Sequence, residues 1–403
     1  MDKKTNNWQI KKLGEVFIIE RGGSPRPIED YITDAIDEIN WIKIGDTKGV
    51  TKYITKTKEK IKPEGLKKSR MVYEGDFILS NSMSFGRPYI MKTSGCIHDG
   101  WLVIRKNEKI NNDYLYYVLN SNQVYSQFSS LAKGSTVKNL NISAVQQVEI
   151  PLPPLETQHA IVSKIEELFS ELDKGIAELK TAQQQLKTYR QSVLKSAFEG
   201  KLTNENVKDG ELPDGWERKT FNDVIDISKE KYKPNNSESK FYVGLEHIEK
   251  NLGVLTAECG FENIKTIKNK FNVGEILYGK LRPYLNKVYL AKENGVCSTD
   301  ILVLKTKKNC NAQFLTHLML GVDFVNTMSE NTSGVNLPRV STKFILEYPI
   351  NLPPIEEQNR IVQEIESRLS VADKMEQSIQ ESLQKAEALR QSILKKAFCG
   401  ELV

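Results

Sequence analysis

One long stretch of the chain occurs twice. Residues 152–202 read LPPLETQHAIVSKIEELFSELDKGIAELKTAQQQLKTYRQSVLKSAFEGKL, and residues 352–402 read LPPIEEQNRIVQEIESRLSVADKMEQSIQESLQKAEALRQSILKKAFCGEL. The copies align without a gap at an offset of 200 residues, and both keep the opening LPP-E-Q and the ending RQS-L-K-AF-G. Similarity that preserves both ends of so long a stretch indicates an internal duplication.

Each copy predicts one long α-helix. A Pro-Pro pair opens each stretch, and proline suits the first turn of a helix but not its interior. Gly200 and Gly400 stand where a C-terminal cap is expected. Such a helix would not be stable alone, because its apolar side chains would be exposed to water. Its natural packing partner is the other copy. The alternative is an ordinary amphipathic helix docked on a globular core.

Apolar residues recur every seven positions along both copies, which is the pattern of a coiled-coil seam. The main column contains Ile165, Leu172, Leu179, Leu186 and Val193 in the first copy, and Ile365, Ala372, Ile379, Ala386 and Ile393 in the second. A weaker column contains Ile161, Leu168, Gly175, Ala182 and Tyr189, with Ile361, Met375 and Leu389 in the second copy. Small residues in one copy that face larger ones in the other would let the helices approach closely.

Two globular segments precede the helices, at residues 1–150 and 204–350. Short β-branched runs alternate with turn residues in both, which predicts mixed α/β domains with a curved antiparallel or mixed sheet. Landmarks recur between them: GDFIL at Gly75 and GEILY at Gly274, then RPYI at Arg87 and RPYL at Arg282. The chain is therefore expected to be an α+β protein of order domain, helix, domain, helix, whose halves pair about a pseudo-twofold axis.

Composition limits the class of protein. The 403 residues are 39% hydrophobic and 27% charged, and no run approaches the length of a membrane span. The N-terminus has no apolar signal core, which predicts a cytoplasmic protein. The five cysteines lie far apart with no C-x-x-C, so neither a disulfide framework nor a thiolate metal site is expected; they are Cys96, Cys259, Cys297, Cys310 and Cys399.

Positive charge is concentrated in the globular segments. Residues 52–70 and 264–287 are rich in lysine and arginine, as expected of segments that neutralise DNA phosphates. A solvated lysine-rich face is the alternative interpretation for either segment. The candidate phosphate-binding residues are Lys56, Lys58, Lys60, Lys67, Lys68, Arg70, Lys265, Lys268 and Lys270.

Polar segments beside these basic runs are suited to contact base edges, because Arg pairs with guanine and Asn with adenine in the major groove. Structural loops are the alternative interpretation. The candidates in the first globular segment are Ser80, Asn81, Ser82, Ser84, Arg87, Lys133, Ser135, Thr136, Lys138 and Asn139. Those in the second are Lys280, Arg282, Asn286, Lys287, Thr332, Ser333, Asn336 and Arg339.

The sequence carries no motif of a catalytic site. It has no phosphate-binding G-x-x-x-x-G-K-[ST] loop and no dinucleotide glycine fingerprint. The [DNS]-P-P-[YF] motif of adenine methyltransferases is also missing, since LPPL and LPPI lack its polar first and aromatic last residues. The histidines show no metal-ligand spacing, and His98 in CIHDG is expected to be buried and satisfied. No catalytic or metal-binding residue is therefore predicted.

Over essentially its whole length the chain resembles the specificity subunits of type I restriction–modification systems. The resemblance is carried by the twin helices with their LPP-E-Q and RQS-L-K-AF-G ends, and by the openings RGGSPRP and YVGLEHIEKNLG of the two globular segments. It implies target-recognition domains at residues 1–150 and 204–350. It also implies spacer helices at residues 151–203 and 351–403 that form an antiparallel coiled coil.

The resemblance further implies a non-catalytic subunit in which each domain reads one half of a split, asymmetric site in double-stranded DNA. The helices would set the gap and dock two modification subunits, the methyltransferases that carry S-adenosylmethionine. Restriction subunits, with ATP and Mg²⁺, would join around them. Two alternatives stay open: the specificity subunit of a type IIB-like enzyme, and a coiled-coil adaptor that binds no DNA.

If the helices act as a spacer, their length sets the number of unread base pairs. Seven-residue insertions after Ala182 and Ser382 preserve the heptad seam and lengthen the pair by up to about 10 Å. Because DNA advances about 3.4 Å per base pair, the gap should grow by one to three base pairs while both half-sites keep their sequence. Sequencing of methylated sites measures this, and an unchanged gap in an active variant would contradict the spacer role.

Overall fold

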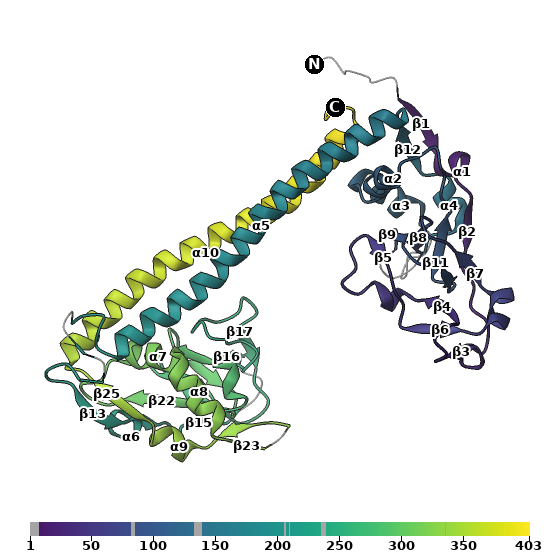
Figure 1. Ribbon diagram of the computed structural model, residues 1–403. Helices are drawn as coiled ribbons and strands as arrows, with labels where there is room; N and C mark the ends of the chain where they lie inside the picture. The colour runs from purple at the N-terminus through teal and green to yellow at the C-terminus, as the bar shows by residue number, and fades with distance from the viewer. Residues whose placement is uncertain are drawn as a thin grey trace. The chain divides into compact units, whose positions relative to one another are not determined.

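The structure is a computed structural model that describes residues 8–81, 85–132, 139–204, 207–208, 210–234, 239–334 and 336–403 (Figure 1). Two compact units are present, one formed by Met1–Leu179 with Glu381–Val403 and the other by Lys180–Gln380. We call them unit 1 and unit 2. The duplicated stretches form the helices α5 (Leu155–Phe198) and α10 (Ile355–Phe398), as their sequences predict. Each unit therefore contains one globular segment and parts of both long helices.

Unit 1 is built on two five-stranded sheets. One has the strand order β2-β11-β8-β9-β5 and the other β3-β6-β4-β10-β7, while β1 and β12 form a separate pair. Most neighbours are antiparallel, but β10 with β4 and β5 with β9 are parallel, so the sheets are mixed as expected. The strands are β1 (Gln9–Lys12), β2 (Ile19–Arg21), β3 (Ile32–Thr33), β4 (Ile39–Ile42), β5 (Tyr53–Ile54), β6 (Glu59–Ile61), β7 (Arg70–Val72), β8 (Phe77–Ser80), β9 (Pro88–Met91), β10 (Gly95–Ile97), β11 (Trp101–Ile104) and β12 (Glu149–Leu152).

The helices of unit 1 cover one face of the β8-containing sheet. Along β8, Phe77 and Leu79 pack with these helices, whereas Ile78 packs toward the second sheet. This alternation of buried side chains places the sheet between two apolar layers. The short helices are α1 (Leu13–Val16), α2 (Asn112–Leu119), α3 (Asn122–Leu131) and α4 (Ile142–Gln146), and the 3-10 helices are η1 (Ile28–Asp30), η2 (Ile44–Thr47) and η3 (Pro63–Lys68).

Unit 2 repeats this topology. Its sheets have the orders β14-β22-β19-β20 and β15-β18-β21-β16-β17, with the pairs β13-β25 and β23-β24 beside them. The strands are β13 (Glu217–Thr220), β14 (Ile225–Ile227), β15 (Lys231–Tyr232), β16 (Ser239–Val243), β17 (Gly260–Asn263), β18 (Lys268–Phe271), β19 (Ile276–Gly279), β20 (Val288–Leu290), β21 (Gly295–Cys297), β22 (Ile301–Thr306), β23 (Thr332–Ser333), β24 (Arg339–Val340) and β25 (Pro349–Leu352); the helices are α6 (Phe221–Val224), η4 (Pro283–Leu285), α7 (Ala312–Leu320), α8 (Val322–Glu330) and α9 (Thr342–Leu346).

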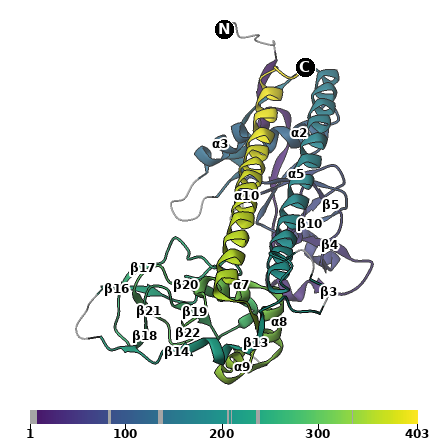
Figure 2. The same cartoon turned by 90° about the vertical axis from the view of Figure 1, so that its left-hand side faces the viewer.

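The long helices run antiparallel and side by side within each unit (Figures 1 and 2). In unit 2, the Arg190 guanidinium pairs with Asp373 at 2.6 Å and with Glu376 at 2.9 Å. In unit 1, Arg390 pairs with Asp173 and lies 4.6 Å from the ring centroid of Phe169. Arg190 and Arg390 are equivalent residues of the repeat, and so are Asp173 and Asp373, so the duplicated sequence makes the same contact twice.

The main heptad column forms the contact between the helices, but the weaker column does so only in part. Ile165, Ile365 and Ala372 are fully buried, and Leu186, Val193, Ile379, Ala386 and Ile393 are at most 8% exposed, while Leu172 and Leu179 are partly exposed. The weaker column was expected to lie beside this seam, yet Tyr189, Met375 and Leu389 are 42–53% exposed. Ile161 and Ile361 of the weaker column are fully buried, and Gly175 and Ala182 are partly exposed, as Leu172 and Leu179 are.

The beginning of each long helix is attached to the domain that precedes it by a buried glutamine. Gln158 accepts a hydrogen bond from the Asn111 backbone N–H at 2.9 Å and donates one to the Pro153 carbonyl at 2.9 Å. Gln358 accepts from the Asn311 N–H at 2.8 Å and donates to the Pro353 carbonyl at 2.8 Å. This contact gives a physical reason for the repeated LPP-E-Q.

The end of each helix is attached to the other domain. Gln391, near the end of α10, accepts a hydrogen bond at 3.1 Å from the N–H of Asn122, the first residue of α3 in unit 1. Gln191 accepts one at 3.0 Å from the N–H of Val322, the first residue of α8 in unit 2. Free N–H groups at a helix start need such acceptors. Each domain is thus held by the start of its own helix and by the end of the other helix.

The compact units divide the long helices in the middle, so they do not test the expected domain boundaries at 150, 203 and 350. The boundaries stay predictions. The expected caps are confirmed, because Gly200 and Gly400 have φ of +78° and +74° and follow the last helical residues, Phe198 and Phe398, by two positions. Among the residues that the structure describes, no helix is long and apolar enough to cross a membrane.

We expect Gln358→Ala to destabilise unit 2 by about 2–3 kcal/mol, because it leaves the part-buried Asn311 N–H and the buried Pro353 carbonyl without partners. The matched control is Gln363→Ala, an exposed position of the same helix, which should change the free energy of unfolding by less than about 0.5 kcal/mol. Urea unfolding of the full chain measures both. Equal stability of the two variants would contradict the role of Gln358.

Candidate nucleic-acid interface

The two polar segments predicted in unit 1 lie beside each other where the structure describes them. The loop between β8 and β9 (residues 81–87) follows Ser80, and the Asn81 carbonyl accepts the Leu140 N–H at 2.9 Å. This bond joins the loop to the segment just before α4. Arg87 and Asn139 are exposed there. Ser82, Ser84, Lys133, Ser135, Thr136 and Lys138 lie outside the described residues.

Two predicted DNA contacts of unit 1 are buried and support this loop. Ser80 and Asn81 are each 1% exposed. The Ser80 hydroxyl accepts the Arg87 N–H at 3.2 Å, and the Asn81 amide donates to the Asp99 carbonyl at 2.8 Å. The sequence predicted that Ser80 and Asn81 face the solvent, because polar side chains are common in loops. Their side chains instead make hydrogen bonds within the protein.

Unit 2 brings its two predicted polar segments together in the same way. The Lys280 carbonyl accepts the Val340 N–H at 3.1 Å, and the Pro338 carbonyl accepts the Arg282 N–H at 2.7 Å. The loop between β19 and β20 (residues 280–287) therefore lies against the hairpin formed by β23 and β24, which projects from the unit in Figure 1. The exposed side chains on this surface are Arg282, Ser333 and Asn336, while Lys280, Thr332 and Arg339 are partly exposed.

Some candidates in unit 2 also have structural partners. Asn286 is 1% exposed, so its side chain lies inside the loop rather than on its surface. Lys287 donates a hydrogen bond from its ammonium to the Ile248 carbonyl. The Arg339 guanidinium lies 3.4 Å from the Asp300 carboxylate. Lys287 therefore stabilises the loop, and Arg339 is oriented by an acidic neighbour, whereas the buried Asn286 amide nitrogen has no hydrogen-bond partner in the described part of the chain.

The structure corrects one correspondence between the domains. RPYI and RPYL suggested that Arg87 and Arg282 are equivalent. In the sheets, Pro88 of β9 pairs with Leu79, whereas Val288 of β20 pairs with Tyr278. Arg87 therefore corresponds to Lys287, and Arg282 belongs to the preceding turn. The short motif match misled here because Arg87 lies directly before β9, whereas Arg282 lies six residues before β20.

The basic segments are only partly free for an external ligand. In unit 1, Lys56, Lys58 and Lys67 are exposed, but Lys60 donates to the Ile36 carbonyl. Lys68 lies 5.9 Å from the Tyr31 ring centroid, and Arg70 pairs with Glu20 at 3.1 Å. In unit 2, Lys265 is exposed, Lys268 lies 4.9 Å from the Tyr242 ring centroid and Lys270 pairs with Glu230 at 3.7 Å.

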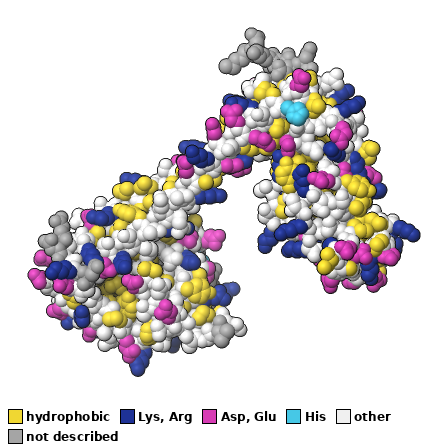
Figure 3. Space-filling model, viewed as in Figure 1, with side chains coloured by type: hydrophobic (Ala, Val, Ile, Leu, Met, Phe, Trp, Pro, Cys, Tyr) yellow, Lys and Arg dark blue, Asp and Glu magenta, His cyan; other side chains and the backbone are white. Residues whose placement is uncertain are grey.

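The surface charge is accordingly mixed. On the face drawn in Figure 3, Lys and Arg side chains alternate with Asp and Glu at the end of unit 1 that carries β3, β4 and β6. Charge pairing of this kind is worth little in stability when it is exposed. The exposed lysines outside these pairs remain the candidates for phosphate contacts.

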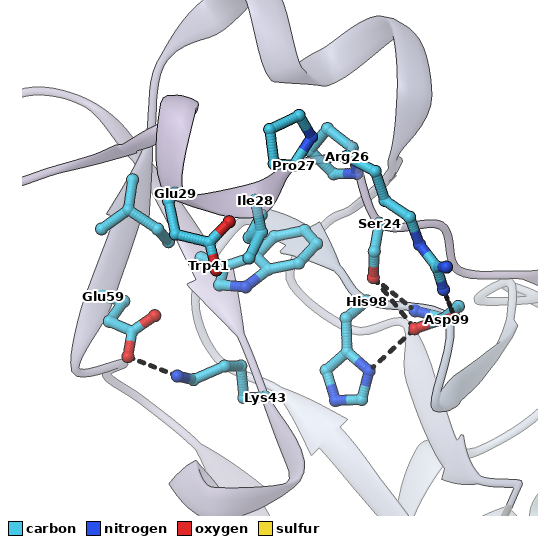
Figure 4. A pocket seen from close by; sticks show the side chains of 12 residues that line it. Ser24, Arg26, Pro27, Ile28, Glu29, Trp41, Lys43, Glu59, His98 and Asp99 are labelled. Atoms are coloured by element: carbon cyan, nitrogen blue, oxygen red, sulfur yellow. Dashed lines mark hydrogen bonds and ion pairs between the residues drawn. The ribbon is translucent and has the colours of Figure 1, made fainter.

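A hollow of about 660 Å³ in unit 1 is lined by residues that include Arg26, Trp41, Lys43, His98 and Asp99 (Figure 4). Its charged side chains pair with one another: Arg26 approaches Asp99 at 3.7 Å, and Lys43 pairs with Glu59. The Asp99 carbonyl also accepts the hydrogen bond from the Asn81 amide. Asp99 therefore connects the hollow to the β8–β9 loop. The sequence did not single out Asp99, since nothing in CIHDG indicates which loops it connects.

His98 borders this hollow and is mostly buried, as expected. Its Nδ1 lies 2.8 Å from the Gly100 nitrogen and its Nε2 lies 3.2 Å from the Ile44 nitrogen, and the neutral ring accepts a hydrogen bond at one of these two positions. Burial lowers the pKa of His98 below its usual value, against the opposing effect of the Asp99 carboxylate. Within the described residues, no group of three or more His, Cys, Asp or Glu is placed to hold a metal ion.

Comparison with known proteins decides the family. Residues 5–181 and 213–385 match the family model of the type I restriction modification DNA specificity domain, once in each half of the chain. The chain belongs to this family. The two matches agree with the repeated topology of units 1 and 2, and they identify the specificity domain as the duplicated element.

Relatives of this specificity family match most of the chain. The Type I restriction enzyme EcoDI specificity subunit of Escherichia coli is 29% identical over 73% of this chain and 70% of its own length. A solved structure described as the crystal structure of the HsdS subunit from Thermoanaerobacter tengcongensis has a TM-score of 0.59 at 20% identity, and covers 98% of each chain.

A further solved structure comes from work on complex assembly and conformational transition of the type I restriction–modification system. It has a TM-score of 0.75 at 19% identity, with 98% of this chain and 99% of that chain covered. These likenesses support the fold of two domains and two long helices. Neither a type IIB-like subunit nor an adaptor without DNA binding is supported by the comparisons.

The β19–β20 loop of this specificity-family chain contains backbone strain at Arg282, whose φ is +52°. Glycine adopts this conformation without the penalty of roughly 1 kcal/mol that other residues carry. We expect Arg282→Gly to raise the melting temperature of the full chain. The control, Lys280→Gly, is not among the positive-φ positions and should lower it. A lower melting temperature for Arg282→Gly would show that its side chain stabilises the loop.

Proposed function

We propose that this chain is the DNA-recognising specificity subunit of a type I restriction–modification complex, in which each domain reads one half of a bipartite, asymmetric site. The observation that carries the proposal is the joined pair of polar segments in each unit, through Asn81 and Leu140 in unit 1 and Lys280 and Val340 in unit 2. Two domains that share a topology but differ in these surface residues are suited to two different half-sites.

Base contacts are assigned to the exposed side chains of these surfaces. Arg87 and Arg282 are exposed, and an arginine can donate two hydrogen bonds to one guanine in the major groove. The hairpin of β23 and β24 adds Ser333 and Asn336, and two-stranded ribbons fit the major groove. Ser80 and Asn81 act instead as buried supports that hold the unit 1 loop in place, and Asn286 is buried and is not assigned a base contact.

Phosphate contacts are assigned to the exposed lysines Lys56, Lys58, Lys67 and Lys265. Contacts of this kind orient a protein on the duplex and carry no sequence information. The net charge of +5 is consistent with an electrostatic contribution to binding. That contribution should fall as the salt concentration rises, because each neutralised phosphate releases counterions.

The long helices are proposed to set the gap between half-sites and to dock two modification subunits. Those subunits would bind S-adenosylmethionine and methylate adenine, and restriction subunits would use ATP and Mg²⁺. The chain itself would catalyse nothing and act in the cytoplasm, where its DNA target lies. The absence of methyltransferase and nucleotide-binding motifs from the sequence supports this division of labour.

Domain replacement tests the proposal. Exchange of residues 1–150 for the equivalent domain of another family member should change one half of the methylated sequence and leave the other half intact. The two halves of the methylated sequence should change independently of each other, because each unit has its own core and its own reading loops. Sequencing of methylated DNA, made by the chain together with its modification subunit, gives the result.

The control is the highly purified chain alone, which should transfer no methyl groups. Methylation by the isolated chain would contradict a non-catalytic subunit. Simultaneous change of both half-sites after exchange of one domain would contradict independent reading.

A further inference from the structure

The turn at η4 in unit 2 is bracketed by two residues in the left-handed region. Arg282 has φ of +52° and Asn286 has φ of +43°, and neither is glycine. Non-glycine residues rarely adopt this conformation, and such strain persists only where the surrounding structure imposes it. The turn between them consists of Pro283, Tyr284 and Leu285.

Hydrogen bonds and burial impose this conformation. The Arg282 N–H donates to Pro338 at 2.7 Å, and the Asn286 N–H donates to Pro283 at 2.8 Å. The Asn286 carbonyl accepts the Asn251 N–H at 3.3 Å, and Pro283 is buried. The turn is therefore held at both ends, so it presents its outer side chains in a fixed orientation before any ligand binds.

Tyr284 is the outer side chain of this turn. It is 48% exposed, and none of the hydrogen bonds or ring contacts among the described residues involves it. A half-exposed aromatic ring on a held turn, two residues from the exposed Arg282, is unnecessary for the core. Aromatic side chains contribute large contact area at low conformational cost in recognition surfaces.

The corresponding loop of unit 1 also carries an aromatic residue. Phe85 lies three residues before β9, and its ring stacks on Tyr125 with centroids 5.6 Å apart and an interplanar angle of 25°. Tyr284 lies four residues before β20. The two domains have diverged in sequence around these loops, yet both keep an aromatic side chain beside the proposed base-contacting arginine.

We propose, on the basis of the proposed function, that Tyr284 is a specificity-determining residue whose ring contacts the methyl group of a thymine in the half-site read by unit 2. Arg282 donates to a guanine near that thymine. Apolar contact with the thymine methyl is a means of readout in the major groove, and a phenol ring offers mostly apolar carbon. A phosphate would instead be contacted by a cation, and the phenol ring of Tyr284 carries no positive charge.

The experiment uses the complex of the full chain with its modification subunits. Methylated genomic DNA first defines the two half-sites for the wild-type chain and for Tyr284→Ala. We expect Tyr284→Ala to methylate sites with another base at one position of the unit 2 half-site, and to bind the original site about 5- to 20-fold more weakly. The unit 1 half-site should not change. Tyr284→Phe should behave like the wild type, because the ring carries the contact.

Synthetic duplexes identify the contacted base. Each thymine of the unit 2 half-site is replaced in turn by deoxyuridine, which removes only the methyl group. One replacement should weaken binding of the wild-type complex by a factor similar to that of Tyr284→Ala. The same duplex should be bound by Tyr284→Ala with no further loss, because the methyl group and the ring form one interaction.

Phe261→Ala is the matched control, since Phe261 is an aromatic residue of the same unit, 71% exposed, on β17 rather than on the loop. It should leave both half-sites and the affinity unchanged. The inference would be overturned if Tyr284→Ala left the unit 2 half-site and the affinity unchanged. It would also be overturned if every deoxyuridine replacement weakened binding of Tyr284→Ala as much as it weakens binding of the wild-type complex. If the wild-type complex methylated no bipartite site, the proposed function would fail instead.

Discussion

The hydrogen bonds of four glutamines at the ends of the two long helices are the constraint on which the rest of the structure depends. Gln158 and Gln358 attach each helix start to its own domain, and Gln191 and Gln391 attach each helix end to the other domain. The first two are at most 2% exposed, where an unpaired amide is costly. Each helix is attached at its start to its own domain and at its end to the other domain. These attachments require the two helices to run antiparallel.

The same constraint explains why the helices diverged less than the domains. A change at one end of a helix disturbs a contact with a domain, whereas a change on a loop surface disturbs no packing. Contacts between the two helices add to this constraint, since Arg190 and Arg390 each pair with an aspartate at the equivalent place of the opposite helix. The loops at residues 81–87 and 280–287 differ in length and in composition while the strands around them keep their pairing.

Burial separates two roles within the recognition surfaces. Asn81 is buried and holds its loop through the Asp99 carbonyl, Asn286 is buried as well, and the exposed Arg87, Arg282 and Tyr284 are the side chains proposed to meet DNA. A reading loop needs both, because an exposed side chain discriminates between bases only when its backbone is held. The left-handed backbone at Arg282 is consistent with such a loop, since its cost is offset by the bonds that tie the turn to Pro338.

The sequence alone determined the duplication, the long helices with their glycine caps, the main heptad column and the family. These depend on periodicity and on repeated residues, which are local properties of the chain. It could not separate Ser80, Asn81 and Asn286 from their exposed neighbours, because burial depends on which distant backbone groups approach. It also matched Arg87 with Arg282, and only the strand pairing of β9 and β20 corrected that alignment. The tertiary structure decided which glutamines join helices to domains and which polar residues face outward, since both depend on contacts between residues far apart in the chain.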